Sequence, residues 1–209
     1  MRILAISDEV VSWMYGPALT ERLGRLDLIL SCGDLPIYYL EFIATAFDCP
    51  AAYVRGNHDH HEIGEEGAVK NHPEGWMPLD MHRRVAAGLA LGGLDGCLRY
   101  NPDASNQYSQ REQWWRAGVL AARSAIPRLR TGRGLDILVT HAPPYGIHNG
   151  PDHAHTGFHA HNWLMQALRP RYVLHGHQHR NYAPMQSGET VVDGVTVVNV
   201  HPYRVLEIQ

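Results

Sequence analysis

The chain has 209 residues, of which 44% are apolar and 19% charged, and its 18 basic and 21 acidic side chains leave a formal net charge of −3. This near-neutral balance argues against nucleic acid as a partner, because nucleic-acid binding needs a basic surface, and the many apolar residues disfavour disorder. No apolar run approaches the roughly 18 residues of a membrane span, and three scattered cysteines are too few for a disulfide framework, so we expect a cytoplasmic protein with no membrane partner.

Short apolar runs alternate with amphipathic stretches in the first quarter of the chain. Residues 3–6, 28–30 and 51–54 predict buried strands, and residues 17–26 and 36–47 predict helices that each begin at a proline. Strands that alternate with helices indicate βαβ units and a mostly parallel sheet.

The middle of the chain is less regular. Residues 60–80 are polar and predict a long loop, whereas residues 85–94 predict two short strands around a turn. Residues 108–124 predict a helix, with Trp114, Trp115, Val119 and Leu120 partly lining its buried side.

The last third of the chain again alternates. Residues 135–140 and 172–174 predict strands, separated by a loop of Gly, Pro and His at 145–160 and a helix at 161–168. The tail, 190–208, predicts three strands that form a meander in a second sheet. No linker or repeat divides the chain, so we expect one domain over the whole sequence, 1–209.

Five of the predicted strands end in polar residues. In chain order these are Asp8, Asp34, Asn57-His58-Asp59, His141, and His177 with His179. Because ligand sites in open α/β sheets lie outside the carboxyl ends of the strands, we expect these side chains to converge on one edge. A mixed set of carboxylate, amide and imidazole groups suits Mn²⁺, Fe, Zn²⁺ or Ni²⁺ better than it suits thiolate-bound zinc. One carboxylate of such a set can bridge two ions.

The order of these motifs resembles the calcineurin-like metallophosphoesterases. The blocks that carry the resemblance are Asp8, Gly33-Asp34, Gly56-Asn57-His58-Asp59, Thr140-His141 and Gly176-His177-Gln178-His179. The resemblance implies a four-layer α/β/β/α sandwich, in which two mixed sheets are flanked by helices. It also implies a phosphoesterase with two divalent metal ions, manganese first, with iron, nickel or zinc as alternatives.

The resemblance further implies a role for each motif residue. Asp34 bridges both ions, Asn57, His141 and His177 complete one site, Asp8 and His179 bind the other, and His58 is the general acid. A metal-bridging hydroxide is expected to attack a small phosphomonoester or phosphodiester substrate, while His58 protonates the departing oxygen.

One position departs from the family pattern, which has Asp-x-His at the first strand end. This chain has Asp8-Glu9-Val10, and valine cannot bind a metal. The site of Asp8 is therefore expected to be the weaker of the two. Glu9 is expected to point to the opposite face of an extended strand, and a loop histidine such as His155 could supply the missing ligand.

Other functions remain open from the sequence. The main alternative is a non-catalytic binding scaffold of the same fold that has lost metal ligands, of which Val10 is one sign. The presence of His58, which binds no metal in the family, favours an enzyme. A metallo-β-lactamase-like hydrolase would need His-x-His-x-Asp-His, which the stretch from His58 to His61 does not match. A TIM-barrel hydrolase would typically need about 250 residues.

Overall fold

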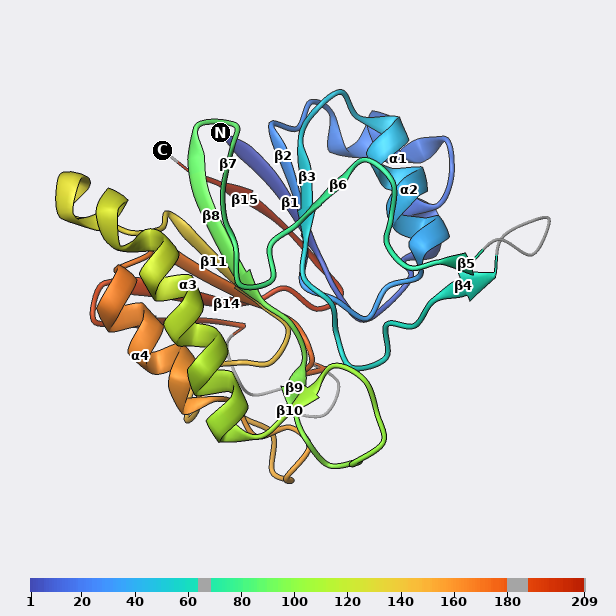
Figure 1. Cartoon of the computed structure of the whole chain (residues 1–209). Helices are drawn as coiled ribbons and strands as arrows, with labels where there is room; N and C mark the ends of the chain where they lie inside the picture. Colours follow the sequence, from blue (N-terminus) through green and yellow to red (C-terminus); the bar gives the residue numbers. More distant parts are fainter. Residues whose placement is uncertain (64–68, 180–187, 209) are drawn as a thin grey trace.

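Two β-sheets lie face to face in the computed structural model, which describes residues 1–63, 69–179 and 188–208 (Figure 1). The first sheet has the strand order β15-β1-β2-β3-β6, and the second has the order β13-β14-β12-β11-β8-β7. The strands of the first sheet are β1 (Arg2–Ile6), β2 (Leu28–Ser31), β3 (Ala51–Tyr53), β6 (Trp76–Pro78) and β15 (Tyr203–Glu207). Those of the second are β7 (Arg83–Ala86), β8 (Leu89–Leu94), β11 (Ile137–Thr140), β12 (Tyr172–His175), β13 (Glu189–Val192) and β14 (Val195–Asn199).

Side-chain alternation along the strands builds the layers. Ile3 and Ala5 of β1 enter a buried cluster between the sheets, which also contains Val139 of β11. Leu4 and Ile6 enter a second cluster with the side chains of α1 (Ala18–Leu23) and α2 (Ile37–Ala46). A third cluster joins the other face of the second sheet to α3 (Gln110–Thr131) and α4 (His159–Leu168). The structure is therefore the α/β/β/α sandwich of two mixed sheets that the resemblance implied (Figure 1).

The helix α3 begins and ends at residues that favour these positions. Ser109 and Glu112 form a capping box, in which the Ser109 hydroxyl accepts a hydrogen bond from the Glu112 N–H at 3.2 Å. Gly132 ends the helix with a φ of 75°, a backbone conformation that glycine adopts at little cost. The helix therefore runs seven residues beyond the predicted end at 124, through Pro127.

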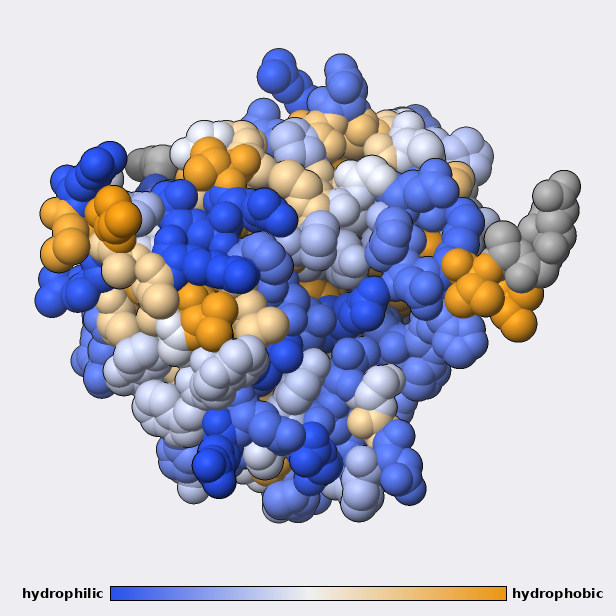
Figure 2. Space-filling model, in the orientation of Figure 1, coloured by the Kyte–Doolittle hydropathy of each residue, from blue (hydrophilic) through white to orange (hydrophobic). Residues whose placement is uncertain are grey.

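The prediction that Trp114 and Trp115 lie on the buried side of this helix is wrong. Trp114 is 42% exposed and Trp115 is 67% exposed. The buried side instead carries Ala117 and Leu120, and Trp114 packs on Trp163 of α4 with ring centroids 5.5 Å apart and the rings tilted by 50°. Leu129, near the end of α3, is 85% exposed, and Figure 2 shows apolar surface there on an otherwise mostly hydrophilic face.

Two further expectations need correction. The tail does not form one meander, because β13 and β14 join the second sheet whereas β15 pairs antiparallel with β1 in the first. The free edge of β1 thus gains a partner, and the tail links the two sheets.

The segment predicted as a loop at 60–80 contains three short strands, β4 (Glu62–Ile63), β5 (Val69–Lys70) and β6. Two more short strands, β9 (Cys97–Leu98) and β10 (Gln107–Tyr108), pair in parallel. No helix of the described residues is long and apolar enough to cross a membrane.

Candidate metal centre

The carboxyl ends of five strands bring the predicted site residues to one edge of the molecule. Asp8 follows β1, Asp34 and Asn57 follow β2 and β3 of the same sheet, and His141 and His177 follow β11 and β12 of the facing sheet. The site therefore spans both sheets. It lies beside the segment that carries β9 and β10, since Asn57 Nδ2 donates a hydrogen bond to the Tyr100 hydroxyl at 3.1 Å (Figure 1).

Asp34, His141 and His177 form a compact group of possible metal ligands. One donor atom from each residue lies within 4.8 Å of the other two. Nε2 of His141 is 3.3 Å from Asp34 Oδ2 and 3.0 Å from Asn57 Oδ1. Its Nδ1 lies 2.8 Å from the Cys32 carbonyl oxygen, so a proton on Nδ1 leaves the Nε2 lone pair for a cation. Nε2 of His177 lies 2.9 Å from the Ala154 carbonyl, which leaves Nδ1 of that ring as its donor atom.

Charge coupling between Asp34 and His141 dominates the electrostatics of this group. Burial alone would raise the pKa of Asp34, but the neighbouring His141 holds it down at about 2. Burial opposes protonation of His141, yet Asp34 beside it raises its pKa to about 10. Burial, together with repulsion from His141, lowers the pKa of His177 to about 3. A proton on His141 thus balances the charge of Asp34, and a divalent ion among the same atoms would balance it more fully.

Asp8 lies at the centre of a second group of polar side chains. Its side chain is 1% exposed, and both carboxylate oxygens accept a hydrogen bond from the backbone N–H of His177 at 3.0 Å. Oδ1 lies 3.8 Å from Nε2 of His179. Burial raises the pKa of Asp8, and repulsion from Asp34 raises it further, although the nearby His141 opposes the shift. A buried carboxylate in this position gains from a neighbouring cation.

The backbone at these strand ends adopts an uncommon conformation. Asp8, Asp34 and His177 have φ values of 67°, 57° and 62°, in the left-handed region that non-glycine residues seldom occupy. Two motif glycines allow the resulting close approach. A Cβ on Gly56 would lie 1.9 Å from Asp34 Oδ1, and one on Gly176 would lie 2.4 Å from Asp8 Oδ2. The glycines of both blocks are therefore needed to place the carboxylates.

Comparison with known proteins decides the family. Residues 1–181 match the family model described as calcineurin-like phosphoesterase. The chain belongs to the calcineurin-like phosphoesterase family. No curated protein sequence matches it significantly.

Three solved structures are similar to this chain at low sequence identity, to different degrees. One crystal structure, 14% identical, aligns over 98% of this chain and 94% of its own with a TM-score of 0.63. The GAP50 anchor in the inner membrane complex of Plasmodium is 13% identical and aligns over 95% of this chain and 70% of its own, with a TM-score of 0.50. A metallophosphoesterase from Sphaerobacter thermophilus is 17% identical over 99% of this chain and 84% of its own, with a TM-score of 0.36.

His58 belongs to the calcineurin-like motif but lies outside the two groups of possible ligands. Its backbone N–H donates a hydrogen bond to Asp34 Oδ1 at 2.7 Å, and the residue is exposed. It lines a cleft of about 650 Å³ together with Asp8, Asp34 and Val10. His58 therefore lines the same cleft as the possible metal ligands Asp8 and Asp34.

Asp59 has a structural role that the sequence did not reveal. Its Oδ2 accepts hydrogen bonds from the backbone N–H groups of Asp34 at 3.1 Å and Gly56 at 2.8 Å. Its Oδ1 accepts one from Leu35 at 3.0 Å. Burial and repulsion from Asp34 raise its pKa to about 6. The sequence signal for Asp59 was its position at the end of the Gly-Asn-His-Asp block. In the structure, the Asp59 carboxylate ties the loop of Asp34 to the loop of Asn57.

The backbone before Glu9 differs from the extended strand on which its expected orientation was based. The rule that successive side chains alternate holds only for extended backbone, and Asp8 has a left-handed conformation. Glu9 Oε2 accordingly lies 3.8 Å from Nε2 of His201, a buried histidine for which the sequence suggested no role.

The histidines of the 148–161 loop differ from one another in their contacts. His148 Nδ1 lies 2.8 Å from Nε2 of the buried His175, and its Nε2 lies 2.9 Å from the Thr190 hydroxyl. His153 Nε2 lies 3.2 Å from the Arg99 carbonyl oxygen. The ring of His155 lies 5.0 Å from that of His177, between centroids, while its Nδ1 lies 2.8 Å from the Asp152 carboxylate. His155 is therefore the one of these three that lies against a possible metal ligand.

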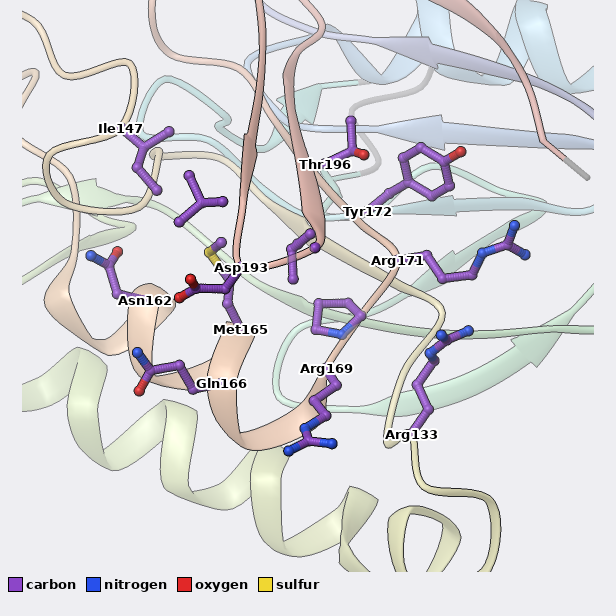
Figure 3. A pocket seen from close by; sticks show the side chains of 14 residues that line it. Arg133, Ile147, Asn162, Met165, Gln166, Arg169, Arg171, Tyr172, Asp193 and Thr196 are labelled. Atoms are coloured by element: carbon purple, nitrogen blue, oxygen red, sulfur yellow. The ribbon is translucent and has the colours of Figure 1, made fainter.

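A separate cavity of about 710 Å³ lies at the other end of the second sheet (Figure 3). It is lined by Arg171 and Tyr172, which stand at the start of β12, whereas His177 follows the end of that strand. Arg133 and Arg169 also line it, but Figure 3 shows the Arg169 side chain directed away from that of Arg133. The three arginines do not converge on one point, and the cavity is not part of the metal centre.

Proposed function

We propose that this protein is a metal-dependent phosphoesterase that hydrolyses a small phosphomonoester or phosphodiester. The observation that carries the proposal is the approach of Asp34, His141 and His177 donor atoms to within 4.8 Å of one another, beside an open cleft. Membership of the calcineurin-like phosphoesterase family supports the same chemistry.

We assign the metal ligands from the family motif and the contacts above. Asp34 would bridge the two ions, His141, His177 and Asn57 would complete one site, and Asp8 and His179 would hold the other ion. The donor set of carboxylate, amide and imidazole groups fits Mn²⁺ first, with iron, nickel and zinc as alternatives. When bound, a pair of such ions polarises the phosphoryl oxygens and activates water at neutral pH.

The chain's own residues supply the remaining chemistry. His58 lines the cleft and is fixed through its backbone to Asp34, so its ring can reach the departing oxygen of a phosphoester and donate a proton to it. Arg55 lines the same cleft and offers a positive charge for a phosphate group. A cleft of about 650 Å³ is within the range of small-molecule sites, which favours a small substrate.

The test is hydrolysis of p-nitrophenyl phosphate and bis(p-nitrophenyl) phosphate by metal-stripped protein, with Mn²⁺, Ni²⁺, Mg²⁺ or Zn²⁺ added back. We expect activity only with added metal, and we expect Asp34→Asn to lower it by orders of magnitude while the fold is retained. Asp48→Asn, which changes an exposed carboxylate before β3, is the matched control and should behave as wild type. Full activity in chelated protein, or in Asp34→Asn, would exclude the proposal.

A non-catalytic scaffold is the second candidate, and Val10 is the observation that favours it. The side chain of Val10 lines the cleft at the position where the family motif has a metal ligand. A scaffold would bind metal without hydrolysing either substrate, and would be insensitive to replacement of His58. The same assay therefore separates the two candidates.

A further inference from the structure

Asn57 can bind a cation through only one of its two amide atoms. The residue is 3% exposed, and its Oδ1 lies 3.0 Å from Nε2 of His141, a member of the group of possible ligands with Asp34 and His177. The amide nitrogen carries two hydrogens and has no lone pair for a cation. A buried N–H group without an acceptor is costly, so the partner of Nδ2 decides how firmly Oδ1 is placed.

The hydroxyl of Tyr100 is a partner of this amide nitrogen. It accepts a hydrogen bond from Asn57 Nδ2 at 3.1 Å. With His141 beside the amide oxygen and Tyr100 beside the amide nitrogen, both ends of the Asn57 side chain are held. Rotation of the amide therefore breaks at least one of these two contacts.

The segment between β9 and β10 fixes the backbone of Tyr100. The side chain of Gln107, which is 3% exposed, accepts hydrogen bonds through Oε1 from the N–H groups of Tyr100 at 3.1 Å and Asn101 at 2.9 Å. In the same segment, Asn106 Nδ2 donates a hydrogen bond to the Asp59 carbonyl oxygen at 3.3 Å. The segment thus contacts the Gly-Asn-His-Asp block at two places, and the hydroxyl of Tyr100 is presented to Asn57 from a backbone that is itself hydrogen-bonded.

We propose that Tyr100 is a positioning residue, whose hydroxyl holds the Asn57 amide with its oxygen directed at the cation of the His141 site. This inference rests on the proposed function, because it concerns one of the same two ions. Tyr100 binds neither the ion nor the substrate. It acts through Asn57, as groups that hydrogen-bond to a metal ligand orient that ligand and strengthen metal binding.

The test is calorimetric titration of metal-stripped Tyr100→Phe with Mn²⁺. The substitution removes only the hydroxyl, so the ring and the backbone contact with Gln107 remain. We expect the ion of the His141 site to bind about 10-fold more weakly than in wild type, at the lower end of the effect of losing a supporting group. Hydrolysis of p-nitrophenyl phosphate should recover at saturating Mn²⁺. Tyr38→Phe, which changes an exposed tyrosine of α2 packed against Tyr15, is the matched control and should bind Mn²⁺ as wild type does.

Asn57→Asp tests whether the effect passes through the amide. A carboxylate can bind a cation through either oxygen and has no N–H group that needs an acceptor, so its orientation does not depend on the Tyr100 hydroxyl. In the Asn57→Asp background, Tyr100→Phe is therefore expected to change the Mn²⁺ affinity by no more than about twofold, as for substitutions that are not coupled. Circular dichroism of each variant establishes that it is folded.

Each result bears on one of the two proposals. Unchanged Mn²⁺ affinity in folded Tyr100→Phe would overturn the role of Tyr100 while leaving the phosphoesterase proposal intact. An equal loss of affinity in the Asn57→Asp background would also overturn it, because the effect would not pass through the amide. Hydrolysis that stays low at saturating Mn²⁺ would assign Tyr100 to the substrate instead. Absence of Mn²⁺ binding in wild type, together with absence of hydrolysis, would exclude the proposed function itself.

Discussion

Removal of the Asp59 carboxylate is expected to weaken both the fold and the metal centre. In Asp59→Ala three backbone N–H groups, those of Asp34, Leu35 and Gly56, lose their acceptor. Each hydrogen bond to a charged acceptor contributes about 1.5–3 kcal/mol, so loss of three such bonds is expected to lower the free energy of unfolding by about 4.5–9 kcal/mol. Because the Asp34 loop loses its tie to the Asn57 loop, we also expect Mn²⁺ affinity to fall by about 10–100-fold, as for other groups that orient ligands.

Asp59→Asn is the matched comparison. The amide oxygen can still accept from Asp34 and Gly56, and loss of the charge relieves the repulsion between Asp59 and Asp34. The expected cost is therefore no more than about 2 kcal/mol, close to that of one unsatisfied N–H group. Urea unfolding of the metal-free proteins measures the stability, and calorimetric titration with Mn²⁺ measures the affinity. If Asp59→Ala unfolds within about 1 kcal/mol of wild type and binds Mn²⁺ equally well, the three hydrogen bonds do not hold the loop.

Two further predictions concern histidines. His58→Ala should lower kcat by about 10²–10⁴-fold without loss of bound Mn²⁺. The decrease should be smaller for p-nitrophenyl esters, because their leaving group needs little protonation. Loss of bound Mn²⁺ in this variant would instead make His58 a metal ligand. Burial lowers the pKa of His161 to about 3, so this ring stays neutral in the folded protein. Below pH 6.5 the ring takes up a proton when the protein unfolds, and the free energy of unfolding therefore falls as the pH falls. From pH 7 to pH 5 the loss is about 2 kcal/mol for this group, and His161→Asn should remove it, because the other titrating groups are common to both proteins and cancel. An unchanged pH dependence of urea unfolding in His161→Asn would contradict the burial effect.

The sequence predicted those parts of the fold that depend on local pattern. The buried strands β1, β2 and β3 and the helices between them are confirmed, because an apolar run bounded by polar residues can be recognised without knowledge of its neighbours. The strand β15 was placed in the wrong sheet, since strand pairing depends on which edge is open, and that is a property of the whole fold. The tryptophans of α3 were also assigned to the wrong face. Trp114 and Trp115 are large and apolar, but the residues that face the second sheet are those with the spacing of Ala117 and Leu120.

The candidate site likewise contains residues that local sequence pattern could predict and contacts that it could not. Residues such as Asp34 and His141 could be proposed because each follows a strand within a short motif, and the structure brings them together. The contacts of Asp59 could not be foreseen, because they are made to backbone N–H groups, which every residue possesses. The left-handed φ of Asp8, on which the direction of the Glu9 side chain depends, cannot be read from a strand pattern. His201 carries no local motif, so its stacking on the His179 ring could not be foreseen from the sequence.

The position of β1 between β15 and β2 has a consequence for the order in which the molecule can assemble. During synthesis β1 emerges long before β15, yet its backbone needs both neighbours, and hydrogen bonds at its start join Met1 to Ile208. Until the tail is made, one edge of β1 is exposed and can pair with other chains. Strand pairing between residues that are far apart in the sequence is also slow to form. During synthesis there is therefore a period in which protection of this strand edge by chaperones matters. The turn that holds Asp8 acquires its final neighbours only when that period ends.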